Sequence, residues 1–551
     1  MEPLPLPQDI LLLLCQELGA RRDFATLFCL SRVSRRVASI ALEQLYRVRD
    51  EADTFPDGKL QTAQLWRSIV LSSLGMTAYP YCAYVRALSL GHLVECLEEM
   101  RPDKAVREFF FDGPMHQFLV LRGLPTRNTR DNSSFLPIDM DRTVVKCVDS
   151  ITIYIRELAD SNGTAVALTH LEGVFIPHDI LPTWITRLGT LTSLRLRDGS
   201  VLGVEAASAI SECCPKFGEL VCYYYQSGSA DEDMAAFFQT LRPNTLRKFE
   251  VLSRNQLGEK SFTALTAHAE SLRSLTITSL SRLAMQGLNM LSPCTALEIL
   301  NIENDRFDSE ALSESLVKEV ATWISNCKSL RELTLTHVQD ALAILKEVME
   351  APGIHLTTLH VKDFSSASPE VTRAAWASLG LQNRLEVLSI NEQDGIVDGL
   401  IVTRTPQLTE SLCRLKSLSS LDLLQAYVSS SDIRLFATAL PNIEYLSFGG
   451  DLLDEAILVT LSTIPKLKAL SINGTSAFRF DSLKDFAQRL DSSAHQGIRV
   501  EILNQWPGAR VTEEEEQWLE RYFADTLNGR IVIHFPNDPD ELHEGDFSDS
   551  D

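Results

Sequence analysis

A short apolar pattern recurs through most of this chain, and it constrains the fold more than any other feature. The pattern is an apolar residue, two residues of any kind, an apolar residue, one residue of any kind and a third apolar residue. Eleven copies start about 28 residues apart, from LTSLRL at 191–196 to LKALSI at 467–472. Weaker copies are VRALSL at 85–90, VDSITI at 148–153 and LTHLEG at 168–173. Apolar positions in alternation predict a short strand with one face turned to a core.

The segments between the copies have the apolar spacing of helices. Examples are VEAASAISECC at 204–214, SLVKEVATWIS at 315–325 and PEVTRAAWASLGL at 369–381. The last segment has Ser368 placed as N-cap and Pro369 at the first helical position. One strand and one helix cannot cover their own apolar faces, so neighbouring units must stack. The sequence therefore predicts an α/β solenoid.

The repeat resembles the leucine-rich repeat family, in its longer strand–helix type. Cys214, Cys294 and Cys327 each stand three residues before a strand pattern, which is similar to the cysteine-containing subclass. The family's regular Asn ladder is missing, and unit lengths vary from 24 to 33 residues. The resemblance implies an irregular horseshoe of about 12 to 14 strand–helix units.

The N-terminus carries the run ILLLLC at 10–15, which is apolar on every side of a helix. A membrane-spanning helix needs about 20 apolar residues, and a secretory signal has a basic start. Neither is found, so we expect an intracellular protein of the cytoplasm or nucleus with no membrane partner. Ile10, Leu11, Leu14 and Leu18 are expected on one helical face, with Leu12, Leu13 and Cys15 elsewhere. One face can serve a small bundle, and the remainder needs another apolar surface.

Residues 4–48 resemble the F-box. The matching residues are Leu6-Pro7-Gln8-Asp9-Ile10, Val33-Ser34-Arg35-Arg36 and Leu45-Tyr46, with helices expected after Pro7 and after the cap candidate Asp23. The Trp or Phe that often follows the Val-Ser-Arg segment is missing. The resemblance implies docking on a Skp-type adaptor, and through it on a cullin–RING ubiquitin ligase. The adaptor-binding residues that it implies are Leu6, Pro7, Ile10, Leu14, Leu18, Leu30, Val33 and Arg35. The alternative is that these helices only cap the open end of the repeat stack.

Strand residues that alternate with the apolar positions are expected on the concave side of the solenoid. This side is the expected target-binding surface of the family, although its mixed residues indicate no ligand class. The candidate target-binding residues are Arg195, Arg197, Tyr223, Glu250, Asn301, Glu303, His360, Lys362, Asn391, Asp422 and Tyr445.

The domain organisation follows from these patterns. We expect an F-box at 1–48, connecting helices at 49–84, leucine-rich repeats at 85–495 with an inserted loop at 121–142, a strand–helix–strand cap at 496–536 that breaks the repeat, and a disordered acidic tail at 537–551.

No motif for catalysis, a metal or a cofactor is found in the sequence. The net charge of −23 argues against a nucleic-acid partner. The eleven cysteines never form C-x-x-C, which favours free thiols. The leading hypothesis is a non-catalytic substrate receptor of an SCF-type ubiquitin ligase with an unknown protein substrate. A repeat scaffold without a ubiquitin link is the alternative, and an enzyme is the third.

Overall fold

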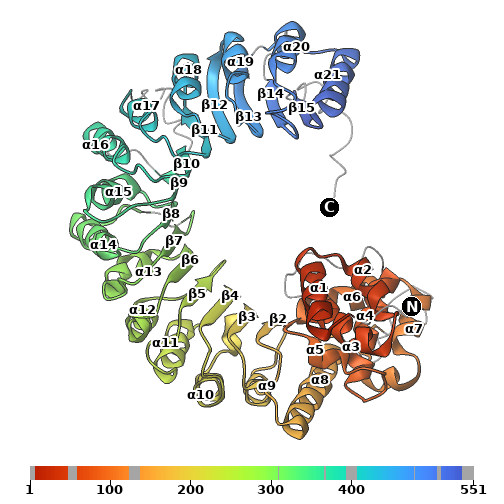
Figure 1. Ribbon diagram of the computed structural model, residues 1–551. Coiled ribbons are helices and arrows are strands. Elements are labelled where there is room, and N and C mark those ends of the chain that lie inside the picture. Colours follow the sequence, from red (N-terminus) through yellow and green to blue (C-terminus); the bar gives the residue numbers. More distant parts are fainter. Residues whose placement is uncertain are drawn as a thin grey trace, which may run out of the picture. The chain divides into compact units, whose positions relative to one another are not determined.

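The protein was studied as a computed structural model that describes residues 6–47, 59–122, 137–307, 310–364, 368–392, 406–476, 478–504 and 510–535. It divides into two compact units, Met1–Leu272 and Arg273–Asp551. In both units parallel strands follow one another in chain order. The helices that alternate with the strands of each unit lie along one side of them and leave the opposite side open (Figure 1).

The described residues of unit 1 contain five strands that pair in parallel with matched registers. They are β1 (Ala87–Ser89), β2 (His170–Gly173), β3 (Ser193–Asp198), β4 (Glu219–Tyr224) and β5 (Lys248–Val251). Leu88, Leu171, Leu194, Leu220 and Phe249 stand opposite one another along the array, and all are buried. The helices that follow these strands are α9 (Leu181–Leu188), α10 (Val204–Cys213), α11 (Ala230–Thr240) and α12 (Glu259–Leu265).

Unit 2 continues the same architecture with ten strands among its described residues. They are β6 (Ser274–Leu280), β7 (Ile299–Asn304), β8 (Glu332–Thr336), β9 (Thr358–Phe364), β10 (Val387–Glu392), β11 (Ser420–Tyr427), β12 (Tyr445–Leu453), β13 (Ala469–Ser476), β14 (Arg499–Asn504) and β15 (Arg530–His534). Its helices are α13 (Arg282–Gln286), α14 (Glu314–Asn326), α15 (Ala341–Glu350), α16 (Pro369–Leu379), α17 (Pro406–Leu412), α18 (Ser430–Ala439), α19 (Ala456–Leu461), α20 (Phe480–Arg489) and α21 (Glu513–Leu527). All eleven strong copies of the pattern form strands, and the predicted leucine-rich-repeat solenoid is confirmed.

The expected strand VDSITI is wrong. Residues 148–153 lie inside the long helix α8 (Met140–Asn162), whose buried residues include Val144, Cys147, Val148, Ile151 and Ile155. This spacing by three and four residues outweighs the short local alternation, because it extends over the whole helix. The chain between β1 and β2 is therefore helical in its described parts, with α6 (Leu90–Glu99), α7 (Lys104–Phe111), the 3-10 turn η2 (Gly113–Phe118) and α8.

The C-terminal segment has the predicted strand–helix–strand order, but its strands extend the repeat, whereas a break in the repeat was expected. Val500 of β14 stands between Leu470 of β13 and Ile531 of β15, and both pairings are parallel. Thr512 and Glu515 form a capping box at the start of α21. In the described part of the chain fourteen strands are each followed by a helix, which agrees with the expected 12 to 14 strand–helix units, and β15 is a fifteenth strand without a helix after it. The expected acidic tail at 537–551 and most of the expected loop at 121–142 lie outside the described residues.

A mixed set of side chains replaces the missing Asn ladder. Trp323 Nε1 and Cys327 Sγ both donate to the carbonyl oxygen of Cys294. Gln382 accepts from the Leu356 amide and donates to the carbonyl of Met349. These contacts satisfy backbone groups that are buried between neighbouring repeats. The side chains therefore take the role that the Asn residues of the ladder have in the family.

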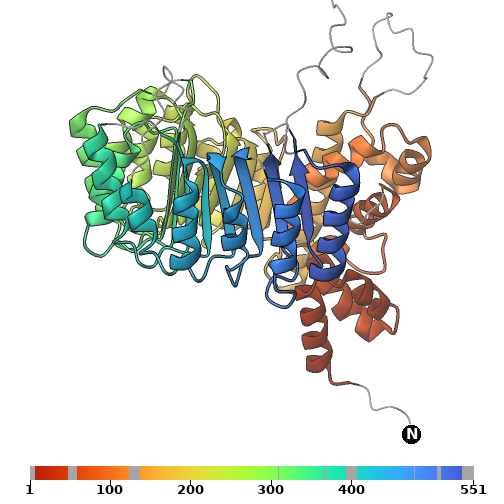
Figure 2. The same ribbon diagram turned by 90° about the horizontal axis from the view of Figure 1, so that it is seen from above.

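The N-terminal part of unit 1 is a group of helices that precede the strands. They are α1 (Gln8–Ala20), α2 (Phe24–Ser31), α3 (Arg35–Arg47), α4 (Lys59–Ser72) and α5 (Tyr81–Tyr84). Helices α1 to α3 lie apart from the strands of this unit, with the start of α1 farthest from them (Figure 2). Among the helices described, none combines the length and apolarity needed to cross a bilayer.

Candidate functional site

The three N-terminal helices form a small bundle with its own core. Leu11 and Cys15 of α1, Leu27 of α2 and Ile40 and Ala41 of α3 are buried together. Leu18, Leu30, Val37 and Leu45 are partly buried against this core. Asp23 caps α2, because the hydroxyl and amide of Thr26 donate to its carboxylate and hold its pKa below the usual range. The local sequence thus fixes the start of α2. Because α2 and α3 pack on one side of α1, the other side of α1 stays exposed.

The opposite side of α1 is apolar and exposed. Ile10, Leu13 and Leu14 are exposed to 45%, 60% and 44%, whereas Leu11 is exposed to only 7%. Residues three and four apart on a helix are neighbours, so Ile10, Leu13 and Leu14 form one patch. Leu6 precedes it, also exposed, and its carbonyl accepts a hydrogen bond of 3.4 Å from Arg36 Nη2. We call Leu6, Ile10, Leu13 and Leu14 the outer α1 face.

The predicted assignment of the α1 faces is wrong in one respect. Leu11 was grouped with Ile10 and Leu14, but it joins Cys15 in the bundle core, because α2 and α3 pack on that side. Leu13 was not selected as a binding residue, although its place three residues after Ile10 could have revealed it. The sequence pattern alone is apolar all round, so it could not separate the two sides.

The predicted adaptor-binding residues fall into two groups. Leu6, Pro7, Ile10, Leu14, Val33 and Arg35 are exposed. Leu18 and Leu30 instead pack partly against the bundle core, so only part of each side chain is accessible. Phe28 on α2 is also exposed, and it was not predicted.

The bundle is attached through α3. Helix α3 packs on α5, while α1 and α2 pack mainly on α3 and on each other. A bundle that capped the strand array would be expected to cover β1 with α1 and α2. Their packing gives no support to that alternative.

The open strand face of unit 1 consists of residues that alternate with the buried strand positions. Arg195, Arg197 and Tyr223 are exposed there, as predicted from the strand register. Glu250 is half-buried, and its carboxylate lies 3.0 Å from Lys248 Nζ on the same strand. Arg197 lies over the ring of Phe175, with 5.9 Å from Cζ to the ring centroid.

The open strand face of unit 2 is more polar and less exposed. The candidate residues Asn301, Glu303, His360, Lys362, Asn391 and Asp422 are half-buried, and Tyr445 is exposed to 50%. Burial raises the pKa of Glu303, and burial followed by the charge of Lys362 lowers the pKa of His360. The pKa of His360 therefore favours its neutral form.

One residue of this face was missed by sequence reasoning. Ser389 on β10 stands in register between His360 on β9 and Asp422 on β11, and its hydroxyl donates to Asp422 Oδ2 at 2.9 Å. Ser389 is almost fully buried, although strand alternation puts it on the same face as the candidate residue Asn391. An alignment of neighbouring repeats could have revealed Ser389, because it puts His360, Ser389 and Asp422 in one row.

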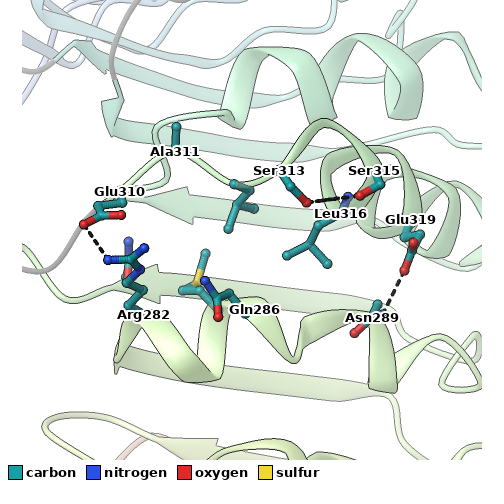
Figure 3. A pocket seen from close by; sticks show the side chains of 12 residues that line it. Arg282, Gln286, Asn289, Glu310, Ala311, Ser313, Ser315, Leu316 and Glu319 are labelled. Atoms are coloured by element: carbon teal, nitrogen blue, oxygen red, sulfur yellow. Dashed lines mark hydrogen bonds and ion pairs between the residues drawn. The ribbon is translucent and has the colours of Figure 1, made fainter.

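A pocket of about 340 Å³ lies between η5 (Leu288–Leu291), α13 and the start of α14 (Figure 3). Arg282 and Glu310 form an ion pair of 2.6 Å at one end, and Asn289 donates to Glu319 at 2.8 Å at the other. Its polar groups thus largely bind one another. Over the described part of the chain, no group of three or more His, Cys, Asp or Glu residues is arranged to hold a metal ion.

Comparisons with known proteins give little beyond this description. No protein-family model and no curated protein matches the sequence. Among solved structures, the chain is similar to one from the complex of Rad7 and Elc1 in yeast, with TM-score 0.39 and 14% identity over 67% of this chain and 92% of that chain. It is also similar to the structure of TLR13 with ssRNA13, with TM-score 0.33 and 14% identity over 72% of this chain. This chain spans 59% of the TLR13 chain. With TM-scores below 0.5, neither similarity supports an inference.

Proposed function

We propose that the chain is the substrate-recognition subunit of an SCF-type ubiquitin ligase. In this role α1 to α3 act as an F-box that binds a Skp-type adaptor, and the open strand faces hold the target protein. The chain itself would contribute no catalytic group, because the ubiquitin transfer occurs on the other subunits. The observation that carries the proposal is the outer α1 face.

The outer α1 face is not explained by the folding of the bundle. The bundle core uses Leu11 and Cys15, so truncating Ile10 or Leu14 would remove little buried area from it. Contiguous exposed apolar side chains on a protein surface mark interaction sites. Desolvated apolar anchors of this kind commonly contribute more than about 2 kcal/mol each to binding. An adaptor that covers this side of α1 would explain why these apolar residues are exposed in the chain alone.

Charge near the outer α1 face supports the same kind of partner. Arg32 and Arg35 are exposed beside Val33 at the turn between α2 and α3. An adaptor surface that is apolar with an acidic surround, as the F-box resemblance implies, would be attracted by these arginines. The attraction would act chiefly on the association rate and would weaken with salt.

Co-purification with a Skp-type adaptor tests the proposal. The intact chain should capture the purified adaptor, and the double variant Ile10→Ala/Leu14→Ala should not. Leu435→Ala is the matched control, because Leu435 is an equally exposed leucine on α18. A melting curve close to that of the intact chain would show that the double variant is folded. If the folded intact chain captures no adaptor, a repeat scaffold without a ubiquitin link becomes the better description.

A further inference from the structure

An aromatic and basic patch lies at the carboxyl ends of the strands in unit 1. The parallel register of β3 and β4 pairs Leu196 with Cys222 and Asp198 with Tyr224, which puts Arg197 opposite Tyr223. The Leu252 amide donates to the Cys222 carbonyl, which places Leu252 beside Tyr223. Phe175 follows β2 and lies against Arg197. We call Phe175, Arg197, Tyr223 and Leu252 the Arg–Tyr patch.

The apolar part of the Arg–Tyr patch is exposed although it sits on a sheet face. Phe175, Tyr223 and Leu252 are exposed to 49%, 39% and 39%. They come from three different repeats, so the fold and not a single segment brings them together. Tyrosine and arginine are the residues that most often dominate binding energies at interfaces. Phe175 also holds the Arg197 guanidinium over its ring, which lowers the entropy that Arg197 would lose on binding.

Two arginines of this region have no acidic partner of their own. Arg197 and Arg254 are exposed, and no ion pair joins either of them to another described residue. Arg254 lies next to β4, since its carbonyl accepts from the Tyr225 amide at 3.0 Å. The two guanidinium groups are therefore available to an external anion.

The acids of the same strands are engaged or lie earlier along them. Glu250 pairs with Lys248, and Asp198 accepts from the Ser200 amide at 2.9 Å. Glu172 stands opposite Arg195, and Glu219 stands opposite Lys248, both nearer the amino ends of the strands than Arg197. Positive charge and apolar area therefore coincide at the carboxyl ends of the strands, in a chain whose net charge is −23.

We propose that the Arg–Tyr patch binds an acidic peptide segment that carries an apolar side chain. Carboxylates of the segment would pair with Arg197 and Arg254, while the apolar side chain would pack on Tyr223 and Leu252. This inference rests on the proposed role of the open strand faces as the target-binding surface, and it names the target's chemistry. A nucleic acid is disfavoured by the net charge, because phosphate binding needs a broad basic surface.

A random peptide library displayed on phage tests the inference on the full-length chain. Selected peptides should be rich in Asp and Glu around a Phe, Leu or Trp. Binding of a selected synthetic peptide should weaken by about tenfold or more in Arg197→Glu and in Tyr223→Ala. It should also weaken with added salt, because exposed charges are screened.

Matched controls separate the patch from general effects. Arg101→Glu makes the same charge reversal at an exposed arginine of the loop between α6 and α7. Phe109→Ala removes an aromatic side chain of similar exposure, 38%, from α7, away from the open strand face. Both controls should bind the peptide as the intact chain does. Melting curves of the two patch variants should match that of the intact chain, since Arg197 and Tyr223 are exposed.

Three outcomes would overturn the inference. They are selected peptides without acidic bias, equal binding by the patch variants and their controls, and stronger Arg197-dependent binding of polyuridylate RNA than of the peptide. The adaptor experiment is independent, because it concerns α1. If adaptor capture fails while the acidic peptides bind as described, the proposed ligase role is wrong and the proposed peptide-binding surface is supported.

Discussion

Tyr46 of α3 stacks on Tyr81 of α5, with ring centroids 4.8 Å apart and ring planes inclined by 25°. The Tyr46 hydroxyl also shares a hydrogen bond of 2.9 Å with the Ser68 hydroxyl on α4. Because α1 and α2 pack mainly on α3, these contacts join the whole three-helix bundle to the rest of unit 1. Tyr46 is therefore one of the side chains that hold the outer α1 face in place relative to the rest of unit 1.

Replacing Tyr46 by Ala should loosen the bundle without unfolding the repeats. The loss of a buried aromatic side chain typically costs about 3–5 kcal/mol. Hydrogen–deuterium exchange should become faster in α1 to α3 and stay unchanged in α10 and α11. Tyr46→Phe is the control, because it keeps the stacked ring and loses only the contact with Ser68. Equal exchange in the two variants would show that the stacking does not hold the bundle.

Leucines on the two sides of α1 should differ in their effect on stability. Leu11→Ala opens the bundle core and should destabilise it by about 2–5 kcal/mol. Leu13→Ala removes an exposed side chain and should change stability by less than about 0.5 kcal/mol. Proteolysis of the bundle over a urea series measures both. A similar cost for the two variants would mean that the outer α1 face is covered by the chain itself.

The repeat architecture could be predicted from the sequence because its signal is local and is repeated many times. LRELTL and LEVLSI each place alternate leucines or isoleucines inward, and β8 and β10 bury those residues as expected. The error at VDSITI arose because six residues cannot distinguish a strand from one and a half turns of a buried helix. The buried residues from Val144 to Ile155 recur at spacings of three and four residues, and this longer pattern identifies the segment as a helix.

The candidate site could be predicted less well, because it depends on contacts between segments. Which side of α1 is buried is decided by α2 and α3, so Leu11 and Leu13 were assigned without the information that separates them. Ser389 was not among the predicted residues, because its contact with Asp422 comes from the neighbouring repeat. The Arg–Tyr patch was half predicted. Arg197 and Tyr223 follow from strand alternation, whereas Phe175 and Leu252 lie outside the repeated pattern.

Inward and outward strand residues of unit 2 should differ sharply in their effect on stability. Leu333→Ala and Leu388→Ala should each destabilise unit 2 by about 2–5 kcal/mol, because both side chains are fully buried. Glu332→Ala should be nearly neutral, because Glu332 is exposed one residue before Leu333. Ser389→Ala should fall between them, since it removes one hydrogen bond worth about 0.5–1.5 kcal/mol. Urea unfolding monitored by exchange in unit 2 distinguishes the three classes, and equal costs would mean that the register is misassigned.

Alkaline pH should destabilise unit 1 through its buried thiols. Burial raises the pKa of Cys82 to about 11 and that of Cys96 to about 12, from an ordinary value of 9.0. The folded chain therefore keeps these protons over a pH range in which the unfolded chain has lost them. The stability that they contribute is fully present below pH 9 and is lost as the pH rises through about 11 to 12.

The contribution of a single thiol can be measured from the slope of the free energy of unfolding against pH. Above pH 9 each such group should lower the free energy of unfolding by about 1.4 kcal/mol per pH unit. Cys96→Ala removes one group, so the slope should become less steep by that amount. The slope is best measured between about pH 9.5 and about pH 10.5, which lies within the window set by these shifts. Urea unfolding of unit 1 in the presence of a reductant measures it. Cys29→Ala is the control, because Cys29 is exposed on α2 and should leave the slope unchanged. An unchanged slope in Cys96→Ala would show that the Cys96 thiol is reached by solvent, and α6 would then be less tightly packed than its buried residues indicate.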